Sequence, residues 1–134
     1  GRLQGIDRER LYGTGTSRGG FGTYSLATAY PDLFAAIACH SGVGNWIMDE
    51  AGRFRDEEGH IRLKEDVANV PTLILHGEID NLVRVELARD VARTLKDRGI
   101  PHELHVFEST GHGYGGNAER YFRMTLEFFD KYGG

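Results

Sequence analysis

Three polar residues of this chain have the types and the surroundings that nucleophilic catalysis needs: Ser17, Asp80 and His112. A serine hydroxyl is a weak nucleophile until an imidazole accepts its proton. A carboxylate must in turn hold that imidazole in the right tautomer and stabilise its cation. We therefore predict that these residues act as nucleophile, orienting acid and general base. Glu78, two residues before Asp80, is the alternative orienting acid.

Ser17 lies at the centre of Gly15-Thr-Ser-Arg-Gly19, a spacing typical of a nucleophile elbow between a strand and a helix. Because the serine of such a turn has strained backbone, we expect side chains at positions 15 and 19 to clash with the neighbouring strand and helix. The turn would expose the hydroxyl above a sheet. It would also direct the backbone N–H of Arg18 at the oxygen under attack, which makes this N–H the predicted oxyanion-hole donor.

A nucleotide-binding turn is the alternative interpretation of the same stretch, since residues 14–19 also look like the glycine-rich opening of short-chain dehydrogenases. Arg18 stands where the dinucleotide fingerprint has its third glycine, and the apolar run 34–39 ends without the acid that would hold a ribose. No tyrosine has a lysine four residues later, and no Gly-Lys pair forms a Walker loop. The sequence therefore favours the elbow.

The elements around these residues indicate an α/β protein. Apolar residues predict strands over 10–16, 34–39, 71–76 and 102–107, and helices over 19–30, 84–98 and from 117 onward. Runs 34–39 and 71–76 lack alternation, as in parallel strands covered on both faces. We predict a three-layer α/β/α sandwich with a parallel sheet of about four strands, in one domain spanning 1–134. Ser17, Asp80 and His112 would meet at the carboxyl ends of the strands.

The helices have predicted inner faces that would pack on the sheet. The first has small residues at helical spacing, the second has a five-residue apolar stripe, and the last has an aromatic stripe. In order, these faces are Gly22, Ser25 and Ala29; Val85, Ala88, Val91, Ala92 and Leu95; and Ala118, Tyr121, Phe122, Thr125, Phe128 and Phe129.

Residues 40–66 form the one long irregular stretch, interpreted as a loop insertion over the site that contains short helical pieces. Trp46 and Met48 are candidates for lining a substrate pocket, and covering the sheet edge is an equally good interpretation. Arg53 and Arg55 would suit an acidic substrate, although a charge-rich segment is more often a solvated face.

Composition excludes several other classes of function. The net charge of −4 comes with mixed signs along the chain, which argues against nucleic-acid binding, and no apolar run approaches the length of a membrane span. The single cysteine, Cys39, excludes an internal disulfide and a cysteine metal cluster. His102 and His105 point to opposite faces of their strand, so we predict no metal site there.

Three motifs in register resemble the C-terminal half of an α/β-hydrolase, closest to prolyl-oligopeptidase-like and related esterase families. They are Gly15-Thr-Ser-Arg-Gly-Gly20, Leu75-His-Gly-Glu-Ile-Asp-Asn-Leu-Val83 and Gly111-His-Gly113, and the order Ser, Asp, His is also that of this fold. The resemblance implies hydrolysis of an ester, thioester or peptide bond through an acyl-enzyme, without metal or organic cofactor. We expect a carboxylesterase; a peptidase of the same fold and an inactive binding module are the alternatives.

Only 16 residues precede Ser17. By the resemblance, the early strands and the loop that supplies a second oxyanion donor would be absent, which would leave the elbow strand at an open edge. Loss of one such donor costs about 3 kcal/mol of transition-state stabilisation. We therefore expect a fragment of a larger hydrolase, or a half-domain completed by an oligomer or another chain, with impaired activity.

Overall fold

The computed structural model describes residues 2–3, 6–7 and 11–133. Its centre is a four-stranded sheet of order β3-β4-β7-β8, in which every neighbouring pair is parallel. The strands are β3 (Leu11–Thr16), β4 (Phe34–His40), β7 (Thr72–Gly77) and β8 (His102–Phe107). Their carboxyl ends lie at one edge of the sheet, as the predicted site requires.

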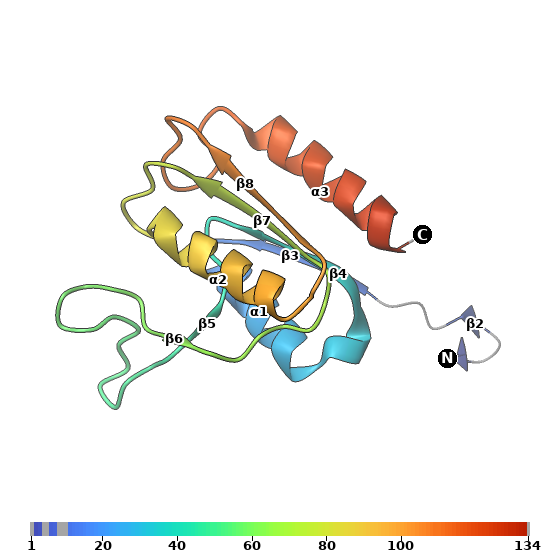
Figure 1. Cartoon of the computed structure of the whole chain (residues 1–134), viewed down its shortest axis with the longest axis horizontal. Coiled ribbons are helices and arrows are strands. Elements are labelled where there is room, and N and C mark those ends of the chain that lie inside the picture. Colours follow the sequence, from blue (N-terminus) through green and yellow to red (C-terminus); the bar gives the residue numbers. More distant parts are fainter. Residues whose placement is uncertain (1, 4–5, 8–10, 134) are drawn as a thin grey trace.

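Helices cover both faces of the sheet (Figure 1), which confirms the predicted three layers. On one face lie α1 (Arg18–Ala29) and α2 (Val85–Asp97), and on the other lies α3 (Ala118–Gly133). The core is correspondingly split by the sheet. On the strands, Ile37, Cys39 and Ile74 pack towards α1 and α2. The strand residues that pack towards α3 are Ala36, Ala38, Leu73 and Leu75.

The helical faces follow the sequence only in part. All five stripe residues of α2 are buried, as predicted. On α1 the buried residues are Gly20, Phe21, Tyr24 and Ala27, so the predicted small-residue face is wrong. Burying a phenylalanine and a tyrosine removes far more apolar area from water than burying a serine does. On α3 only Tyr121, Thr125 and Phe128 are buried, and Phe122 is 65% exposed because it lies beside this narrow stripe.

Residues 45–64 form an extended arm in place of the predicted short helical pieces. It begins and ends in an antiparallel pair, β5 (Asn45–Trp46) with β6 (Leu63–Lys64), and a further bridge joins Arg55 to Ile61. Within the arm, the Asp49 carboxylate accepts the backbone N–H groups of Ala51 and Arg53. Such side-chain bonds stabilise turns at the expense of a helix, which explains the failed prediction.

The remaining described pieces are short. A 3-10 turn (Pro31–Leu33) links α1 to β4, and β1 (Arg2–Leu3) pairs with β2 (Ile6–Asp7). Within the described residues β3 pairs with β4 alone and is thus an edge strand. The expectation that another chain covers this edge stays a prediction. No described helix is both long enough and apolar enough to cross a bilayer.

Candidate active site

Ser17 occupies a sharp turn between β3 and α1. Its backbone has φ 57° and ψ −117°, a positive φ that residues other than glycine seldom adopt. Backbone bonds on both sides hold it there: the Ser17 N–H donates to the His40 carbonyl at 2.8 Å, and the Ser17 carbonyl accepts the N–H of Gly20 at 2.9 Å. Arg18 is the first residue of α1, where N–H groups have no acceptor within the helix. The turn therefore has the form of a nucleophile elbow.

The elbow needs glycine at two positions, and one of them differs from the expectation. A Cβ on Gly15 would lie 2.3 Å from the Gly19 carbonyl group, so the strand and helix pass too closely for any side chain there. A Cβ on Gly19 would meet nothing within 4 Å, which contradicts the expected clash. The second position is Gly20, whose Cβ would lie 2.2 Å from the Gly42 carbonyl oxygen. The helix is thus pressed against the loop after β4.

The structure brings Ser17, Asp80 and His112 into one hydrogen-bonded line. The His112 Nδ1 atom lies 2.8 Å from Asp80 Oδ2, and its Nε2 atom lies 2.9 Å from Ser17 Oγ. Because a carboxylate accepts hydrogen bonds, Nδ1 carries the proton and leaves Nε2 free to accept the serine proton. The three residues follow β3, β7 and β8, 95 positions apart at the extreme.

Asp80 is the buried acid of this line, and the alternative acid Glu78 is exposed. Asp80 Oδ1 accepts the backbone N–H groups of Leu82 and Val83, at 2.9 and 2.8 Å. Its other oxygen is thereby aimed at His112. The side chain of Asp80 is fully buried, and a buried charge without partners would be strongly unfavourable. These hydrogen bonds supply the partners.

A second histidine, His76 of β7, supports the loop that contains Asp80. His76 is fully buried, and its Nε2–H donates to the Val83 carbonyl at 2.7 Å, while the same nitrogen is 3.5 Å from Asp80 Oδ2. Burial lowers the pKa of His76 below its ordinary value, so the ring is neutral at pH 7. His76 therefore holds the loop of Asp80 through a hydrogen bond and adds no positive charge beside the carboxylate.

The loop of His112 is tied to the elbow by Tyr114. The Tyr114 hydroxyl bonds Thr16 Oγ1, immediately before Ser17, and lies 3.4 Å from His40 Nδ1. His40 Nε2–H donates to Thr125 Oγ1 at 2.9 Å, and burial lowers the pKa of His40 to about 4. His40 is therefore neutral at pH 7, and the hydrogen bonds of Tyr114 fix the position of the loop.

A cavity of about 520 Å³ opens beside Ser17, within the size range of small-molecule sites. Trp46 lines it, but its two faces stack on Phe21 and Phe54, with ring centroids 4.6 and 4.0 Å apart. Met48 is 57% exposed and is not among the lining residues. The full lining is Ser17, Arg18, Phe21, Trp46, Gly52, Arg53, Phe54, Arg55, Asp56, Ile61, Leu82, Val83 and His112.

Sequence reasoning missed several residues near the site, chiefly Phe21, Phe54 and Tyr114. No pattern marked Phe54, which is a single aromatic residue in a polar run. Tyr114 stands two residues after His112 in a glycine-rich loop, and an aromatic side chain there was the available signal. Phe21 and Tyr114 reach their partners Trp46 and Thr16 through contacts between residues far apart in the sequence.

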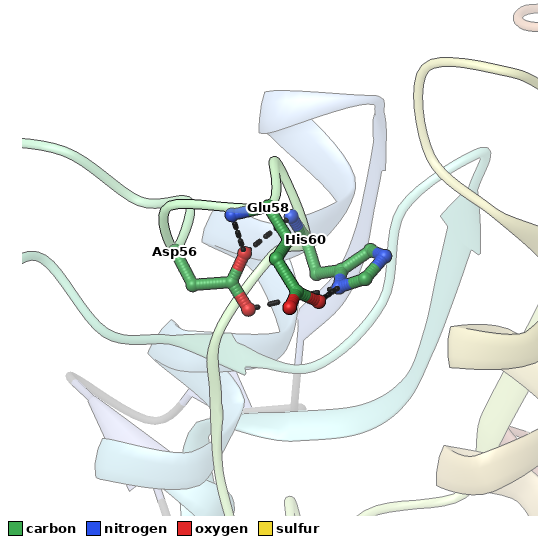
Figure 2. Close-up of side chains that lie close together, drawn as sticks. All are labelled: Asp56, Glu58 and His60. Carbon is green, nitrogen blue, oxygen red and sulfur yellow. Dashed lines mark hydrogen bonds and ion pairs between the residues drawn. The ribbon is translucent and has the colours of Figure 1, made fainter.

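The tip of the arm gathers three groups capable of binding a metal ion, Asp56, Glu58 and His60, all exposed (Figure 2). Asp56 Oδ1 accepts the backbone N–H groups of Glu58 and His60 at 2.9 Å, and His60 Nδ1 lies 3.6 Å from a carboxylate oxygen of each acid. These contacts account for the cluster as a turn.

The parallel sheet, the elbow and the order of the three loops are those of the α/β-hydrolase fold. Residues 2–134 match the prolyl oligopeptidase family, and the chain belongs to that family. This confirms the resemblance drawn from the three motifs.

Relatives of this chain include peptidases and esterases. Dipeptidyl-peptidase 5 of Porphyromonas gingivalis is 25% identical, over 80% of this chain and 19% of that protein. A thermostable esterase is 26% identical with a TM-score of 0.66, over 95% of this chain and 32% of the other. A puromycin-hydrolyzing peptidase of Mycobacterium tuberculosis is 24% identical with a TM-score of 0.73, over 96% and 23%. The chain spans between 13% and 49% of the curated relatives that it matches.

Proposed function

We propose that this chain is a serine hydrolase that cleaves carboxylic esters through an acyl-enzyme on Ser17. The observation that carries the proposal is the pair of contacts at His112, 2.9 Å to Ser17 Oγ and 2.8 Å to Asp80 Oδ2. These distances lie within hydrogen-bonding range, as a nucleophile, a base and an orienting acid require. Membership of the prolyl oligopeptidase family supports a hydrolase of this type.

In the proposed reaction, Ser17 Oγ attacks the acyl carbon while its proton passes to His112 Nε2. The negative charge on the carbonyl oxygen of the tetrahedral intermediate faces the Arg18 backbone N–H. Collapse of the intermediate breaks the bond to the alcohol oxygen, which takes the proton from His112. Water then attacks the acyl-enzyme, gives one proton to His112 and releases the acid, and Ser17 Oγ regains its proton. Asp80 stays ionised and stabilises the imidazolium.

Peptide-bond hydrolysis by the same groups is the second candidate, favoured by the family and by the similarity to a dipeptidyl-peptidase. The leaving group would then be an amine, protonated by His112 in the same way. An inactive binding module is the third interpretation, in which the cavity binds a ligand and Ser17 does not react.

A fluorophosphonate probe separates an enzyme from a binding module. We expect labelling of the wild-type chain and of Ser25→Ala, a control serine on α1 away from the cavity, and no labelling of Ser17→Ala. A wild-type chain that stays unlabelled would contradict the proposal. Turnover of a 4-nitrophenyl ester and of the 4-nitroanilide with the same acyl group then distinguishes an esterase from a peptidase.

A further inference from the structure

The walls of the cavity beside Ser17 carry more positive than negative charge. Three arginines line it, Arg18, Arg53 and Arg55, against one carboxylate, Asp56. The whole chain has a net charge of −4, so the cavity departs from the average of the protein. A cavity lined mainly by one sign of charge concentrates ligands of the opposite sign.

The three arginines differ in their partners. Arg53 Nε lies 2.8 Å from Asp49 Oδ2, so its charge is neutralised. Among the described residues, Arg55 donates only to carbonyl oxygens, those of Gly59 at 2.8 Å and Leu82 at 2.7 Å. These bonds use two of the five N–H donors of its guanidinium, and no carboxylate of the described residues pairs with its charge. They also place the group between the arm and the loop of Asp80.

Arg18 is the second cation without a described counter-ion. Its guanidinium carbon lies 5.9 Å from the centroid of the Phe54 ring, and no ion pair joins Arg18 to any of the described residues. Arg18 directly follows Ser17, so its side chain leaves the backbone next to the reacting hydroxyl. One of the positive charges that line the cavity therefore belongs to the residue next to Ser17.

The one carboxylate of the lining does not neutralise these cations. Asp56 is held within its own turn by the backbone N–H groups of Glu58 and His60, and its second oxygen faces the His60 ring (Figure 2). The hydrogen bond from the His60 backbone N–H lowers the pKa of Asp56, which keeps it ionised. No ion pair links it to Arg18 or Arg55 within the part of the chain that the structure describes.

We propose that the cavity selects substrates that carry a carboxylate, which binds to the guanidinium groups of Arg18 and Arg55 while the acyl carbon faces Ser17. This inference rests on the proposed function. Guanidinium groups suit carboxylates because they donate two parallel hydrogen bonds and keep their charge at any working pH. The carboxylate belongs either to a small ester or to an acidic side chain of a peptide, since both offer the same group.

Binding is measured without catalysis in the Ser17→Ala variant, through the fluorescence of Trp46. It is the single tryptophan of the chain and lines the cavity, so its emission reports occupancy. The probes are 4-phenylbutyrate and its neutral carboxamide, which differ in charge and not in shape. We expect the carboxylate to bind about tenfold more tightly, as charge-assisted hydrogen bonds imply.

Substitutions of Arg18 and Arg55 test whether these two residues cause the preference for the carboxylate probe. Arg18→Gln and Arg55→Gln should each reduce it to twofold or less, while Arg18→Lys, which keeps the charge, should retain most of it. Arg93→Gln is the matched control, because it removes the same charge from α2 outside the cavity. Equal binding of the two probes, or a preference that survives both glutamine variants, would overturn the inference.

Turnover gives an independent readout in the wild-type chain. The 4-nitrophenyl monoester of adipic acid should have a higher kcat/KM than the 4-nitrophenyl ester of adipic monoamide. Peptide 4-nitroanilides ending in glutamate or glutamine form the second pair of substrates. A preference for the acid in the ester pair identifies a small ester as the source of the carboxylate, and a preference in the peptide pair identifies an acidic side chain. A preference for the neutral member of both pairs contradicts the inference. Absence of fluorophosphonate labelling contradicts the proposed function, whereas the fluorescence titration still decides the charge preference.

Discussion

The neighbouring glycines at positions 19 and 20 should respond to alanine in opposite ways. A methyl group on Gly19 meets nothing within 4 Å, and position 19 lies in the first turn of α1. Alanine there should stabilise the fold by roughly 0.5–1 kcal/mol, the cost that glycine imposes on a helix. A methyl group on Gly20 would lie 2.2 Å from the Gly42 carbonyl oxygen and 3.3 Å from that of Gly15. Because both contacts are to backbone, relief requires a helix shift, and we expect a loss of about 3 kcal/mol.

Urea unfolding followed by circular dichroism at 25 °C measures both effects, and fluorophosphonate labelling reports the elbow. Gly19→Ala should unfold at a higher urea concentration than the wild type and keep its labelling rate. Gly20→Ala should unfold at a much lower concentration and react more slowly, since its helix also carries the Arg18 N–H. A Gly19→Ala chain destabilised by 2 kcal/mol or more, or a Gly20→Ala chain within 1 kcal/mol of the wild type, would refute this reasoning.

Three further substitutions test the supports of the site. Asp80→Asn should lower kcat by about 10⁴-fold in ester hydrolysis, because an amide cannot accept from both the His112 ring and the backbone N–H groups without a clash of donors. Burial lowers the pKa of His40 to about 4 from 6.5, so the unfolded chain binds more protons between these values. The free energy of unfolding should therefore fall by up to about 3 kcal/mol on acidification through this window. In urea titrations at several pH values, the free energy of unfolding of His40→Gln should fall less than that of the wild type. Tyr114→Phe removes the hydroxyl bonded to Thr16 and should cost about 1 kcal/mol of stability, with kcat reduced several-fold and KM unchanged in steady-state assays.

Much of the fold could be predicted because its signals are local. The apolar runs 34–39 and 71–76 have the pattern of strands buried on both faces, and the α2 stripe is long and regular. Parallel strands then place Ser17, Asp80 and His112 at one edge whatever the details of packing. The distances between their side chains follow from contacts that the sequence does not show.

The failed predictions for α1 and for the arm depend on contacts that the sequence alone does not show. On α1, Gly22 and Ser25 have the right spacing for close packing, but Phe21 and Tyr24 gain more from burial and turn the helix towards their side. The stretch 40–66, which contains the arm, was expected to hold short helical pieces. Its conformation depends instead on side chains such as Asp49, which bond nearby backbone groups in competition with a helix. Such competition is decided by tertiary context.

Two separate parts of the structure serve the site, and they are built differently. The loops of the acid and the histidine are locked by backbone: a Cβ on Gly77 would lie 2.3 Å from the Thr110 carbonyl oxygen, and the Ile79 N–H donates to that same oxygen at 3.0 Å. The arm over the cavity is exposed, and Arg55 attaches its tip to the Leu82 carbonyl. We therefore expect substitutions in the arm to change the cavity while the line from Ser17 to Asp80 keeps its geometry. The charge that Arg55 contributes from the arm should therefore be separable from the proposed chemistry, whereas Arg18 is the residue after Ser17 and belongs to the elbow itself.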